Sequence, residues 1–546
     1  MTILSLNRKE IENVIGKIKP DVEEKISMFG TPVENLSNEE LSVEVFPNRP
    51  DLLSMQGFSR ALLNFFEKKK IFEYTVNKPE KDYEVKVEKV VKSIRPFTVC
   101  AIIKGLKLDD QKIKNIIDIQ EKLHLSIGRK RRKIAIGIYP LEKIKLPIRF
   151  TAKKPDDIKF IPLESEKELT GRQILRQHPT GKEYAHLLED KEIFPIFIDA
   201  ENKILSMPPI INSQETGKIT ENTKDVFIEC SGHNLAYLKK SMNILVTAFA
   251  DMGGVIYAMN IKDAKDFISP DLEPEKLKFS LDDINKTLGT KFNEKDIKRY
   301  LEKMGIKYEK INNENIAFIP AYRTDLLHWI DLAEEVAIAY GYEKFEPEIP
   351  SISTISEEDK QAIIKRTIEE ILTGLQLLEA SSFHLCKRQD IKKMHYDFKE
   401  FIELIESKTE YDTLRMDLIT NLLKIISENS DSSYPQKIFE IGKVFKKNTQ
   451  KETGIEENES LAIAITNENS NFTELKQILD YLFRMIDKEY SLEPVENSGY
   501  ILGRCAKILV DKKEAGIIGE VSPRVLKNWK LKMPVCALEM KLDWIK

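Results

Sequence analysis

The chain has 546 residues, and its 85 lysines and arginines nearly balance its 89 aspartates and glutamates, so the formal net charge is −4. This length predicts several domains, each able to bury a core, and the charge excludes a global basic field for nucleic acid, so any such contact must be local. The sequence has neither an apolar leader segment nor an apolar run long enough to cross a membrane, so we expect a cytoplasmic protein without membrane partners.

Residues 1–93 are predicted to form an N-terminal domain followed by a linker. The string LSVEV at 41–45 alternates as a strand does, and Pro47 and Pro50 then force an extended turn. Asp51 is placed to cap a helix that runs through Phe65. Residues 71–93 are rich in lysine and glutamate, which indicates a linker or an exposed ribbon.

Residues 94–268 are predicted to form a second domain, built mainly from strands. It opens with the strand RPFTVCAIIKGLKL, followed by a helix, a basic turn and a second strand. The turn is the strongest local positive patch of the chain. Such a run is usually solvated, but beside a histidine and a strand it can hold phosphate. The candidates for that contact are His124, Arg129, Lys130, Arg131 and Arg132.

The strand DVFIECSG at 225–232 brings a carboxyl group and a hydroxyl group to one face. Because side chains alternate along a strand, Val226 and Ile228 lie on one face, while Phe227, Glu229 and Ser231 lie on the other. The two polar groups form either a polar pair at a sheet edge with a helix cap, or part of a pocket, and alternation alone does not decide between them.

The five cysteines are far apart and fall mostly in apolar, strand-like runs. Their spacing matches neither a zinc site nor a disulfide framework, so we expect reduced thiols in the core. They are Cys100, Cys230, Cys386, Cys505 and Cys536.

Residues 269–348 are predicted to form a third, winged-helix-like domain. The pattern gives one helix ending near Gly289, a second ending near Gly305, a hairpin with an asparagine-rich turn, and a further helix. The segment is not basic, so a packing or interaction role is favoured over DNA binding.

The last helix of this domain carries several acids. Thr324 or Asp325 is the expected N-cap, and Gly341 lies just past the predicted end. Spacings of three and four residues place acids on one flank, which favours either a solvated acidic face or a site for a hard cation or a basic partner surface. The candidate acids are Asp325, Asp331, Glu334 and Glu335.

Residues 349–546 read as one mixed α/β domain, with a long helix at 358–375 followed by successive antiparallel strands. This pattern by itself supports only an α+β fold. The segment contains neither a glycine-rich phosphate loop nor a paired ATP-binding signature, and Gly519 and Glu520 are a weak signal on their own.

Several strings, in the same order, resemble the beta subunit of phenylalanyl-tRNA synthetase of the archaeal and eukaryotic type. The resemblance implies an α+β multidomain fold: an N-terminal α/β segment, a β-rich editing domain, a winged-helix-like domain and a class II synthetase catalytic-like antiparallel α/β module that has lost catalysis. LRMDLITNLLK occupies the place of the motif arginine of that module. The strings are EVFPNRPDLLSMQGFSRAL, QEKLH, GRKR, AIGIY, SMPPIINS, DVFIE, the PAYRTD segment, DLAEE and YGY.

The same resemblance implies a function. An alpha subunit would use ATP to attach phenylalanine to tRNA(Phe) in an α2β2 tetramer, and this chain would hydrolyse mischarged Tyr-tRNA(Phe) by water attack. Ser206, Glu229 and Ser231 are the implied pocket residues, with Asn212 and Thr223 as weaker candidates. Many members carry an aspartate where this chain has Tyr139 and Pro140.

The resemblance also implies Mg²⁺ at the contact with the alpha subunit, held by Asp325, Asp331, Glu334 and Glu335. Two other functions remain open. The chain could be a non-catalytic tRNA-binding or assembly scaffold, or a free-standing hydrolase that needs no partner, although its size argues against the latter.

Overall fold

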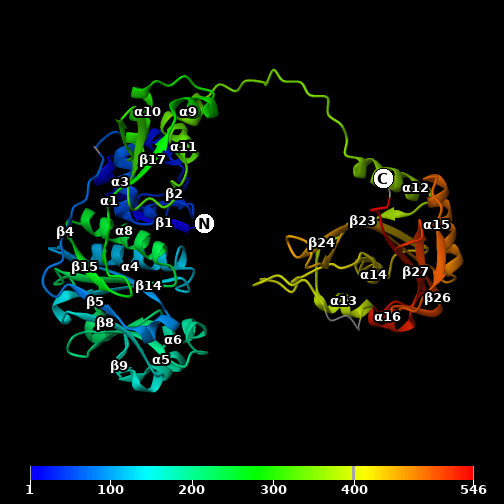
Figure 1. The fold of residues 1–546 in the computed structure, drawn as a ribbon, viewed down its shortest axis with the longest axis horizontal. Coiled ribbons are helices and arrows are strands. Elements are labelled where there is room, and N and C mark those ends of the chain that lie inside the picture. Colours follow the sequence, from blue (N-terminus) through cyan, green and yellow to red (C-terminus); the bar gives the residue numbers. More distant parts are fainter. Residues whose placement is uncertain (1, 70, 396–399, 545–546) are drawn as a thin grey trace. The chain divides into compact units, whose positions relative to one another are not determined.

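A computed structural model describes the chain except for residues 1, 70, 396–399 and 545–546, and it divides into two compact units, Met1–Glu348 and Ile349–Lys546 (Figure 1). Each unit mixes helices with sheets, so the predicted α+β class is confirmed. Within the described residues, no helix is long and apolar enough to cross a membrane. The five cysteines are buried and free, as expected.

The first layer of unit 1 is a three-stranded antiparallel sheet with three helices. Its elements are β1 (Thr2–Asn7), α1 (Arg8–Ile15), α2 (Pro20–Met28), β2 (Val33–Leu36), β3 (Glu40–Val45) and α3 (Met55–Phe65), with strand order β1-β3-β2. The strand predicted at 41–45 is therefore confirmed.

The expected cap of α3 is wrong. Asp51 lies in a 3-10 turn, and its carboxylate accepts hydrogen bonds from Arg49 Nε at 3.0 Å and Nη2 at 2.9 Å. Because that carboxylate is already occupied, the cap falls to the next polar side chain, and Ser54 Oγ accepts from the backbone N–H of Gly57 at 3.0 Å.

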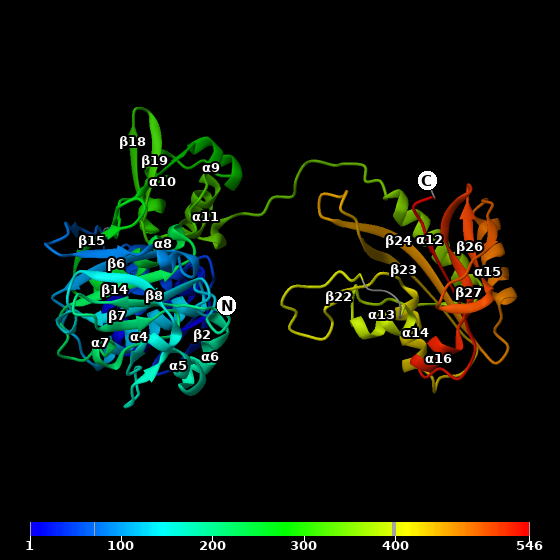
Figure 2. The ribbon, with the colours of Figure 1, turned by 60° about the horizontal axis from the view of Figure 1, so that its bottom comes forward.

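An eleven-stranded sheet forms the body of unit 1. Its order is β13-β12-β11-β8-β5-β15-β6-β14-β7, with β16 and β4 also on β15 (Figure 2). The strands are β4 (Val76–Asn77), β5 (Glu84–Val87), β6 (Phe97–Lys104), β7 (Ile134–Pro140), β8 (Ile148–Lys153), β11 (Phe194–Ile198), β12 (Ile204–Met207), β13 (Ile211–Asn212), β14 (Val226–Gly232), β15 (Val255–Lys262) and β16 (Phe267–Ser269).

The prediction of a linker or exposed ribbon at 71–93 is therefore wrong in part. Strand β5 lies inside the large sheet, parallel to both β15 and β8, and Val85 is fully buried. This strand has only two valines, and each lies beside lysine or glutamate. Such a short alternation does not predict a strand within a stretch of mostly charged residues.

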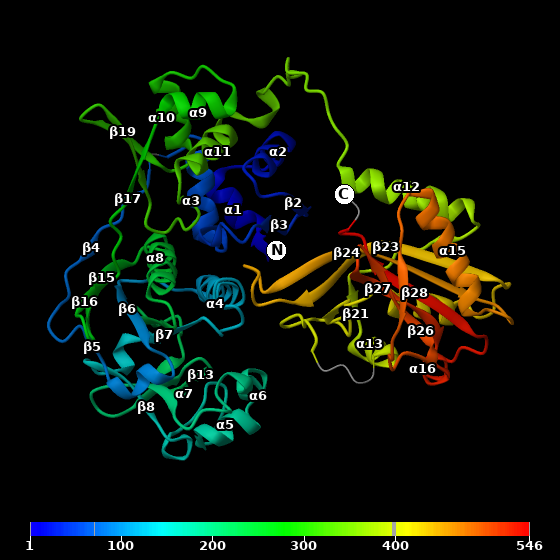
Figure 3. The same cartoon turned by 45° about the vertical axis from the view of Figure 1, so that its right-hand side comes forward.

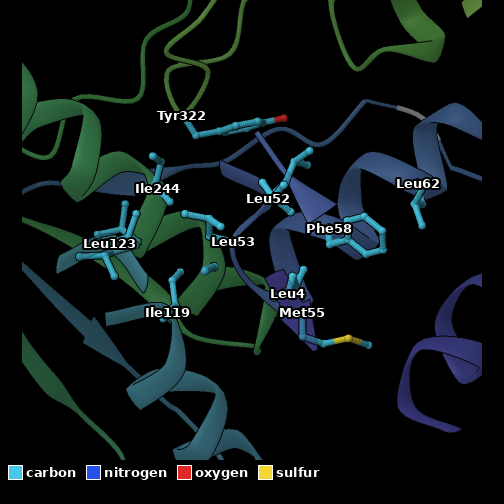
Figure 4. Packing of buried hydrophobic residues seen from close by; sticks show 14 of the residues in the cluster. Leu4, Leu52, Leu53, Met55, Phe58, Leu62, Ile119, Leu123, Ile244 and Tyr322 are labelled. Atoms are coloured by element: carbon cyan, nitrogen blue, oxygen red, sulfur yellow. The ribbon is translucent and has the colours of Figure 1, made fainter. Parts of the chain in front are cut away.

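Helices α4 (Asp110–Leu125) and α8 (Leu235–Asp251) cover one face of β6, β14 and β7 (Figure 3). The predicted alternation of β14 is confirmed: Val226 and Ile228 pack in the apolar cluster under these helices, and Phe227 packs in a separate cluster on the other face. The cluster under the helices continues into the N-terminal layer, where Leu4, Phe58, Ile119 and Ile244 meet (Figure 4).

Within residues 269–348, the predicted order of two helices, a hairpin and a further helix is confirmed. The hairpin turns at Asn312 and Asn313, whose φ angles are +50° and +65°, and Gly289 ends the first helix with φ +66°. An unpredicted strand, β17, completes a three-stranded sheet of order β17-β19-β18. The elements are β17 (Glu275–Phe279), α9 (Leu281–Leu288), α10 (Glu294–Lys303), β18 (Lys307–Ile311), β19 (Glu314–Ile319) and α11 (Trp329–Tyr340).

Unit 2 is a seven-stranded sheet between two helical layers. All its neighbouring strands are antiparallel except β20 and β23, and the order is β20-β23-β24-β28-β27-β26-β25. Helices α12 and α15 pack on one face, and α14 and α16 on the other. The elements are α12 (Lys360–Gly374), β20 (Leu378–Glu379), β21 (Leu385–Cys386), α13 (Arg388–Met394), β22 (Thr413–Leu414), α14 (Ile419–Glu428), β23 (Gln436–Lys447), β24 (Ile455–Thr466), α15 (Phe472–Met485), β25 (Ser491–Pro494), β26 (Tyr500–Val510), β27 (Lys513–Val521), α16 (Pro523–Asn528) and β28 (Val535–Lys541).

Candidate functional site

A cavity of about 530 Å³ lies in unit 1 between α4, strands β7 and β14, and the segment around β12 and β13. Two short helices, α6 (Pro179–Tyr184) and α7 (Gln214–Gly217), contribute to its wall, and β9 (Lys159–Phe160), β10 (Leu169–Thr170) and α5 (Gly171–Gln177) precede α6 in the chain. The predicted residues Ser206 and Glu229 both line it, as do His124 and Arg131. The remaining wall is largely apolar, with Ile136 and Ile138 from β7 among its members.

Glu229 carries the most perturbed carboxyl group of this cavity. Burial raises its pKa to about 8, although Arg95, the Tyr139 hydroxyl and the Ser231 hydroxyl each act in the opposite direction. At pH 7 the group is therefore mostly protonated. The Tyr139 hydroxyl lies 3.3 Å from Glu229 Oε1 and 3.3 Å from Asn212 Oδ1. Among the described residues, Glu229 Oε2 has no hydrogen-bond partner.

A glycine makes room for this arrangement. Gly137 of β7 is the register partner of Glu229 on β14. A Cβ atom at this position would lie 2.6 Å from Glu229 Oε1 and closer still to the Tyr139 hydroxyl. Any side chain at position 137 would therefore displace one of the two polar groups.

The two predicted serines have different positions. Ser206 is 1 % exposed, and its Oγ finds no hydrogen-bond partner in the described part of the chain. Ser231 lies on the same face of β14 as Glu229, but it is not among the described residues that line the cavity, and its Oγ accepts from Arg95 Nε at 3.0 Å. Of the weaker candidates, Asn212 lines the cavity, whereas Thr223 Oγ1 accepts from Thr220 N–H in a turn.

Some residues of the basic turn are held by hydrogen bonds within the domain, and others have exposed side chains. The Ile136 N–H donates to His124 Nε2 at 2.8 Å, so His124 Nδ1 carries the proton and faces Glu121 Oε1 at 3.2 Å. Burial lowers the pKa of His124. Arg131 donates to the Ile210 carbonyl at 2.8 Å and to Glu121 at 2.9 Å, whereas the side chains of Arg129, Lys130 and Arg132 are exposed. RNA contact by this turn stays a prediction.

Sequence reasoning missed His178, which also lines the cavity. It is 9 % exposed, and its Nε2 lies 3.1 Å from the Leu163 carbonyl. Because a carbonyl only accepts, Nε2 carries the proton and Nδ1 is an acceptor, for which the described residues offer no donor. The only available signal was a histidine immediately before the proline that opens α6.

The acidic helix α11 begins later than expected. His328 is its N-cap, and Asp331 accepts from the N–H groups of Leu327 and His328, each at 2.7 Å. The expected cap at Thr324 or Asp325 is wrong because Asp325 is bound by Arg323 and chain 325–328 is not yet helical. Gly341 ends the helix with φ +106°, as predicted.

The four acids are held in different ways. Arg323 is 2 % exposed, and its Nη2 lies 2.8 Å from both Asp325 Oδ2 and Glu335 Oε1. Glu334 is exposed, and its pKa is raised by partial burial and then by the charges of Glu335 and Asp331. Among the described residues, no three His, Cys, Asp or Glu side chains converge as a ready set of metal ligands. The Mg²⁺ site stays a prediction.

In unit 2, Arg415 stands where the resemblance places the motif arginine. It is 2 % exposed, and its Nη1 lies 2.6 Å from Glu440 Oε1 while Nε donates to the Lys443 carbonyl at 2.7 Å. The guanidinium charge is thus neutralised by a carboxylate of the chain itself. The sheet face beside it is covered by an apolar cluster that includes residues of α14 and α16.

Comparisons with known proteins agree with this architecture. Residues 103–246 match the B3/4 domain, residues 277–342 the tRNA synthetase B5 domain, and residues 346–542 the phenylalanyl tRNA synthetase beta chain CLM domain. These modules define a subunit of an aminoacyl-tRNA synthetase. The chain belongs to the family of phenylalanine–tRNA ligase beta subunits, which confirms the resemblance found in the sequence.

Similar curated members come from archaea. The beta subunit of Thermococcus onnurineus is 38 % identical over 512 residues, covering 91 % of this chain and 89 % of the relative. That of Archaeoglobus fulgidus is 33 % identical over 555 residues, covering 100 % of this chain and 98 % of the relative. Among solved structures, an N-terminal fragment of the Pyrococcus horikoshii beta subunit has a TM-score of 0.59 at 36 % identity, covering 62 % of this chain and 99 % of that chain.

Proposed function

We propose that this beta subunit hydrolyses mischarged Tyr-tRNA(Phe) in the cavity that contains Ser206 and Glu229, as part of an α2β2 complex in the cytoplasm. The alpha subunit would attach phenylalanine to tRNA(Phe) with ATP. The observation that carries the hydrolytic role is a pair of buried polar atoms, Glu229 Oε2 and Ser206 Oγ, in the wall of a cavity of about 530 Å³, and the described residues offer neither atom a hydrogen-bond partner.

This arrangement of hydrogen-bond donors and acceptors suits the phenolic hydroxyl, which tyrosine has and phenylalanine lacks. The protonated carboxyl of Glu229 and the Ser206 hydroxyl can each exchange a hydrogen bond with a phenol, while Ile136 and Ile138 contact the ring. A phenylalanine ring would leave both polar atoms unpaired, at a cost of about 1–3 kcal/mol each. A cavity built to bind a hydroxyl thus discriminates far better than one built to exclude it.

Hydrolysis itself requires a water molecule and a group that accepts its proton. His178 Nδ1 is the buried acceptor in the wall of the cavity, and Leu163 fixes its tautomer. We assign the attacking step to water oriented by His178 and by the ribose hydroxyls of the tRNA terminus.

The test is deacylation of Tyr-tRNA(Phe) by the complete complex. Glu229→Ala, alone or with Ser231→Ala, should slow deacylation about 10–100-fold, and Ser206→Ala should slow it about 3–10-fold, because the substitutions of Glu229 and Ser206 each remove a hydrogen bond to the phenol. Phenylalanylation should be unchanged. Ser241→Ala is the matched control, since it also removes a buried hydroxyl without a partner in the described chain, but on α8 and away from the cavity.

Unchanged deacylation in all of these variants would contradict the proposal. It would leave the chain as a non-catalytic tRNA-binding or assembly scaffold. Deacylation of the same substrate by this chain without its alpha partner would instead identify a free-standing hydrolase.

We further propose a Mg²⁺ ion at α11, near the contact with the alpha subunit. Magnesium retains several waters and needs only one or two protein carboxylates. Glu334 and Asp331 are the acids that Arg323 does not hold, so they would be the direct ligands, while Asp325 and Glu335 would contact the ion through water. Partial burial and then the charges of Glu335 and Asp331 raise the pKa of Glu334, and a bound cation would offset the repulsion between these charges.

A further inference from the structure

A second cavity, of about 430 Å³, adjoins the first, and Pro209 belongs to the walls of both. Basic side chains dominate its lining: Lys92, Arg95, Arg132, Lys191, His186 and His233, against one carboxylate, Asp190. We call this the basic cleft.

Arg95 distinguishes the basic cleft from an ordinary charged surface. Four arginines of the described chain are buried, and three of them have carboxylate partners: Arg60 with Asp251, Arg323 with Asp325 and Glu335, and Arg415 with Glu440. Arg95 is 3 % exposed, yet no carboxylate of the described residues lies within ion-pair distance of it. Its hydrogen bonds go to Ser231, at 3.0 Å to Oγ and 2.6 Å to the carbonyl.

The carboxyl group that acts electrostatically on Arg95 does not neutralise this charge. Glu229 interacts with Arg95 electrostatically, but its own pKa of about 8 leaves it mostly protonated at pH 7. Burial lowers the pKa of Arg95 to about 10, which leaves the guanidinium charged at neutral pH. A buried charge without a countercharge is costly, and an anionic ligand removes that cost.

Of the other basic side chains, Lys191 adds to the same positive field, and His233 responds to that field without adding charge to it. The pKa of His233 is lowered by burial and then by Arg95 and Lys191. Lys191 is exposed at the mouth of the basic cleft. Lys92 is the exception, because it forms an ion pair with Asp263.

We propose that the basic cleft binds a phosphodiester group of the 3′-terminal nucleotides of the acylated RNA whose aminoacyl group enters the adjoining cavity. The assignment rests on the proposed hydrolytic function. The aminoacyl ester and the nearest phosphate are joined by a single nucleoside, and the two cavities share the Pro209 wall, so one nucleotide can reach both. Ser231, which hydrogen-bonds Arg95, is then a residue of the basic cleft rather than of the hydrolytic cavity.

The first experiment measures binding of a fluorescent single-stranded oligoribonucleotide ending in CCA to the complete complex, by anisotropy at several salt concentrations. Lys191→Glu should weaken binding about tenfold. It should also reduce the slope of log K against log salt concentration by about 0.7, which is the contribution of one phosphate contact on a single strand. Lys154→Glu is the matched control, because Lys154 is also exposed in this domain but lines neither cavity. Arg95→Gln should weaken binding at least as much. Because Arg95 is buried, its substitution could disturb folding, whereas Lys191 is exposed, so Lys191→Glu tests the same cleft without that risk.

The second experiment measures deacylation of Tyr-tRNA(Phe). Lys191→Glu should raise KM about tenfold and leave kcat nearly unchanged. Wild-type oligonucleotide binding by both Lys191→Glu and Arg95→Gln would overturn the proposal. Equal competition by inorganic phosphate and by the oligonucleotide at the same concentration would also overturn it, since it would identify a free-phosphate site. Oligonucleotide binding that depends on Lys191 in a complex that does not deacylate would uphold the basic cleft and reject the hydrolytic function.

Discussion

At the scale of single residues, the chain contrasts two ways of burying charge. Arg60, Arg323 and Arg415 each meet a carboxylate that neutralises them, so they need nothing from outside the chain. Glu229 and Arg95 are buried on either side of Ser231 without forming an ion pair with each other, and Glu229 responds by holding its proton. Buried ionisable groups with perturbed pKa values cluster at functional sites.

The raised pKa of Glu229 predicts a pH dependence of local stability. The group ionises near pH 8 in the folded chain and near 4.5 when unfolded, so between these values the unfolded state has lost a proton that the folded state keeps. Stability therefore falls as pH rises from about 5 to 8, by up to about 1.4 kcal/mol per pH unit, and this effect is absent below pH 4. Glu229→Gln cannot ionise, so at pH 8 its β14 amides should exchange hydrogen more slowly than those of the wild type.

The comparison is made at matched pH, at pH 5.5 and pH 8, because the intrinsic exchange rate itself changes with pH. The exposed Glu142→Gln in the same domain is the control and should follow the wild type at both values. A difference between Glu229→Gln and wild type that is the same at pH 5.5 and pH 8 would show that Glu229 is already ionised in the folded chain.

The residues of this site that the sequence predicted are those whose contacts lie close together in the chain. Glu229 was predictable because alternation along one strand places it with Ser231. Arg95 was not, because its partner is 136 positions away in the chain, and neither was the acceptor role of His178, which depends on a carbonyl 15 positions away. The family resemblance supplied Ser206, which periodicity alone did not single out.

At the scale of elements, sequence signals predicted the C-terminal ends of helices well, but they predicted N-caps and strand pairing poorly. Gly289 and Gly341 ended their helices as expected, since a glycine accepts the positive φ that a helix terminus requires. Both failed caps have one cause: Asp51 and Asp325 are each held by an arginine two positions earlier, so neither carboxylate is available to backbone N–H groups. Strand β5 was missed because its two valines give only a short alternation, and because its partners, β15 and β8, are distant in sequence.

Helix α11 gives a prediction that separates metal binding from folding. Glu334→Gln alters an exposed acid, so it should leave the melting temperature within about 1 °C and weaken Mg²⁺-dependent association with the alpha subunit. Glu335→Gln removes a buried partner of Arg323, which should cost about 3 kcal/mol and lower the melting temperature by several degrees. The measurements are thermal unfolding of the chain alone and a Mg²⁺ titration of subunit association.

The reverse pattern would reject this division of the four acids. If Glu335→Gln leaves stability intact but abolishes the Mg²⁺ dependence, then Glu335 is a direct ligand and Arg323 is held by Asp325 alone. If neither variant changes the Mg²⁺ dependence, α11 carries a solvated acidic face and no cation site.

At the scale of the whole molecule, the chain keeps a synthetase-like sheet in one unit and the proposed hydrolytic cavity in the other. In unit 2 the arginine at the motif position is buried against Glu440, and α14 and α16 fill the neighbouring sheet face. An internal carboxylate that already neutralises a guanidinium weakens the attraction of that guanidinium for a triphosphate. We therefore expect no ATP chemistry from unit 2 alone.

This division of labour predicts that the chain without its alpha partner does not catalyse phenylalanine-dependent ATP–pyrophosphate exchange. Removing the internal carboxylate should not restore it: Glu440→Gln leaves Arg415 buried without a countercharge, so the expected result is a loss of about 3–5 kcal/mol of stability and still no exchange. The control is Glu457→Gln, which removes an exposed partner of Lys443 on the adjacent strand and should change neither property by a measurable amount. Exchange by the isolated wild-type chain at the rate of the complex would show that Arg415 leaves Glu440 for ATP, and that unit 2 is itself catalytic.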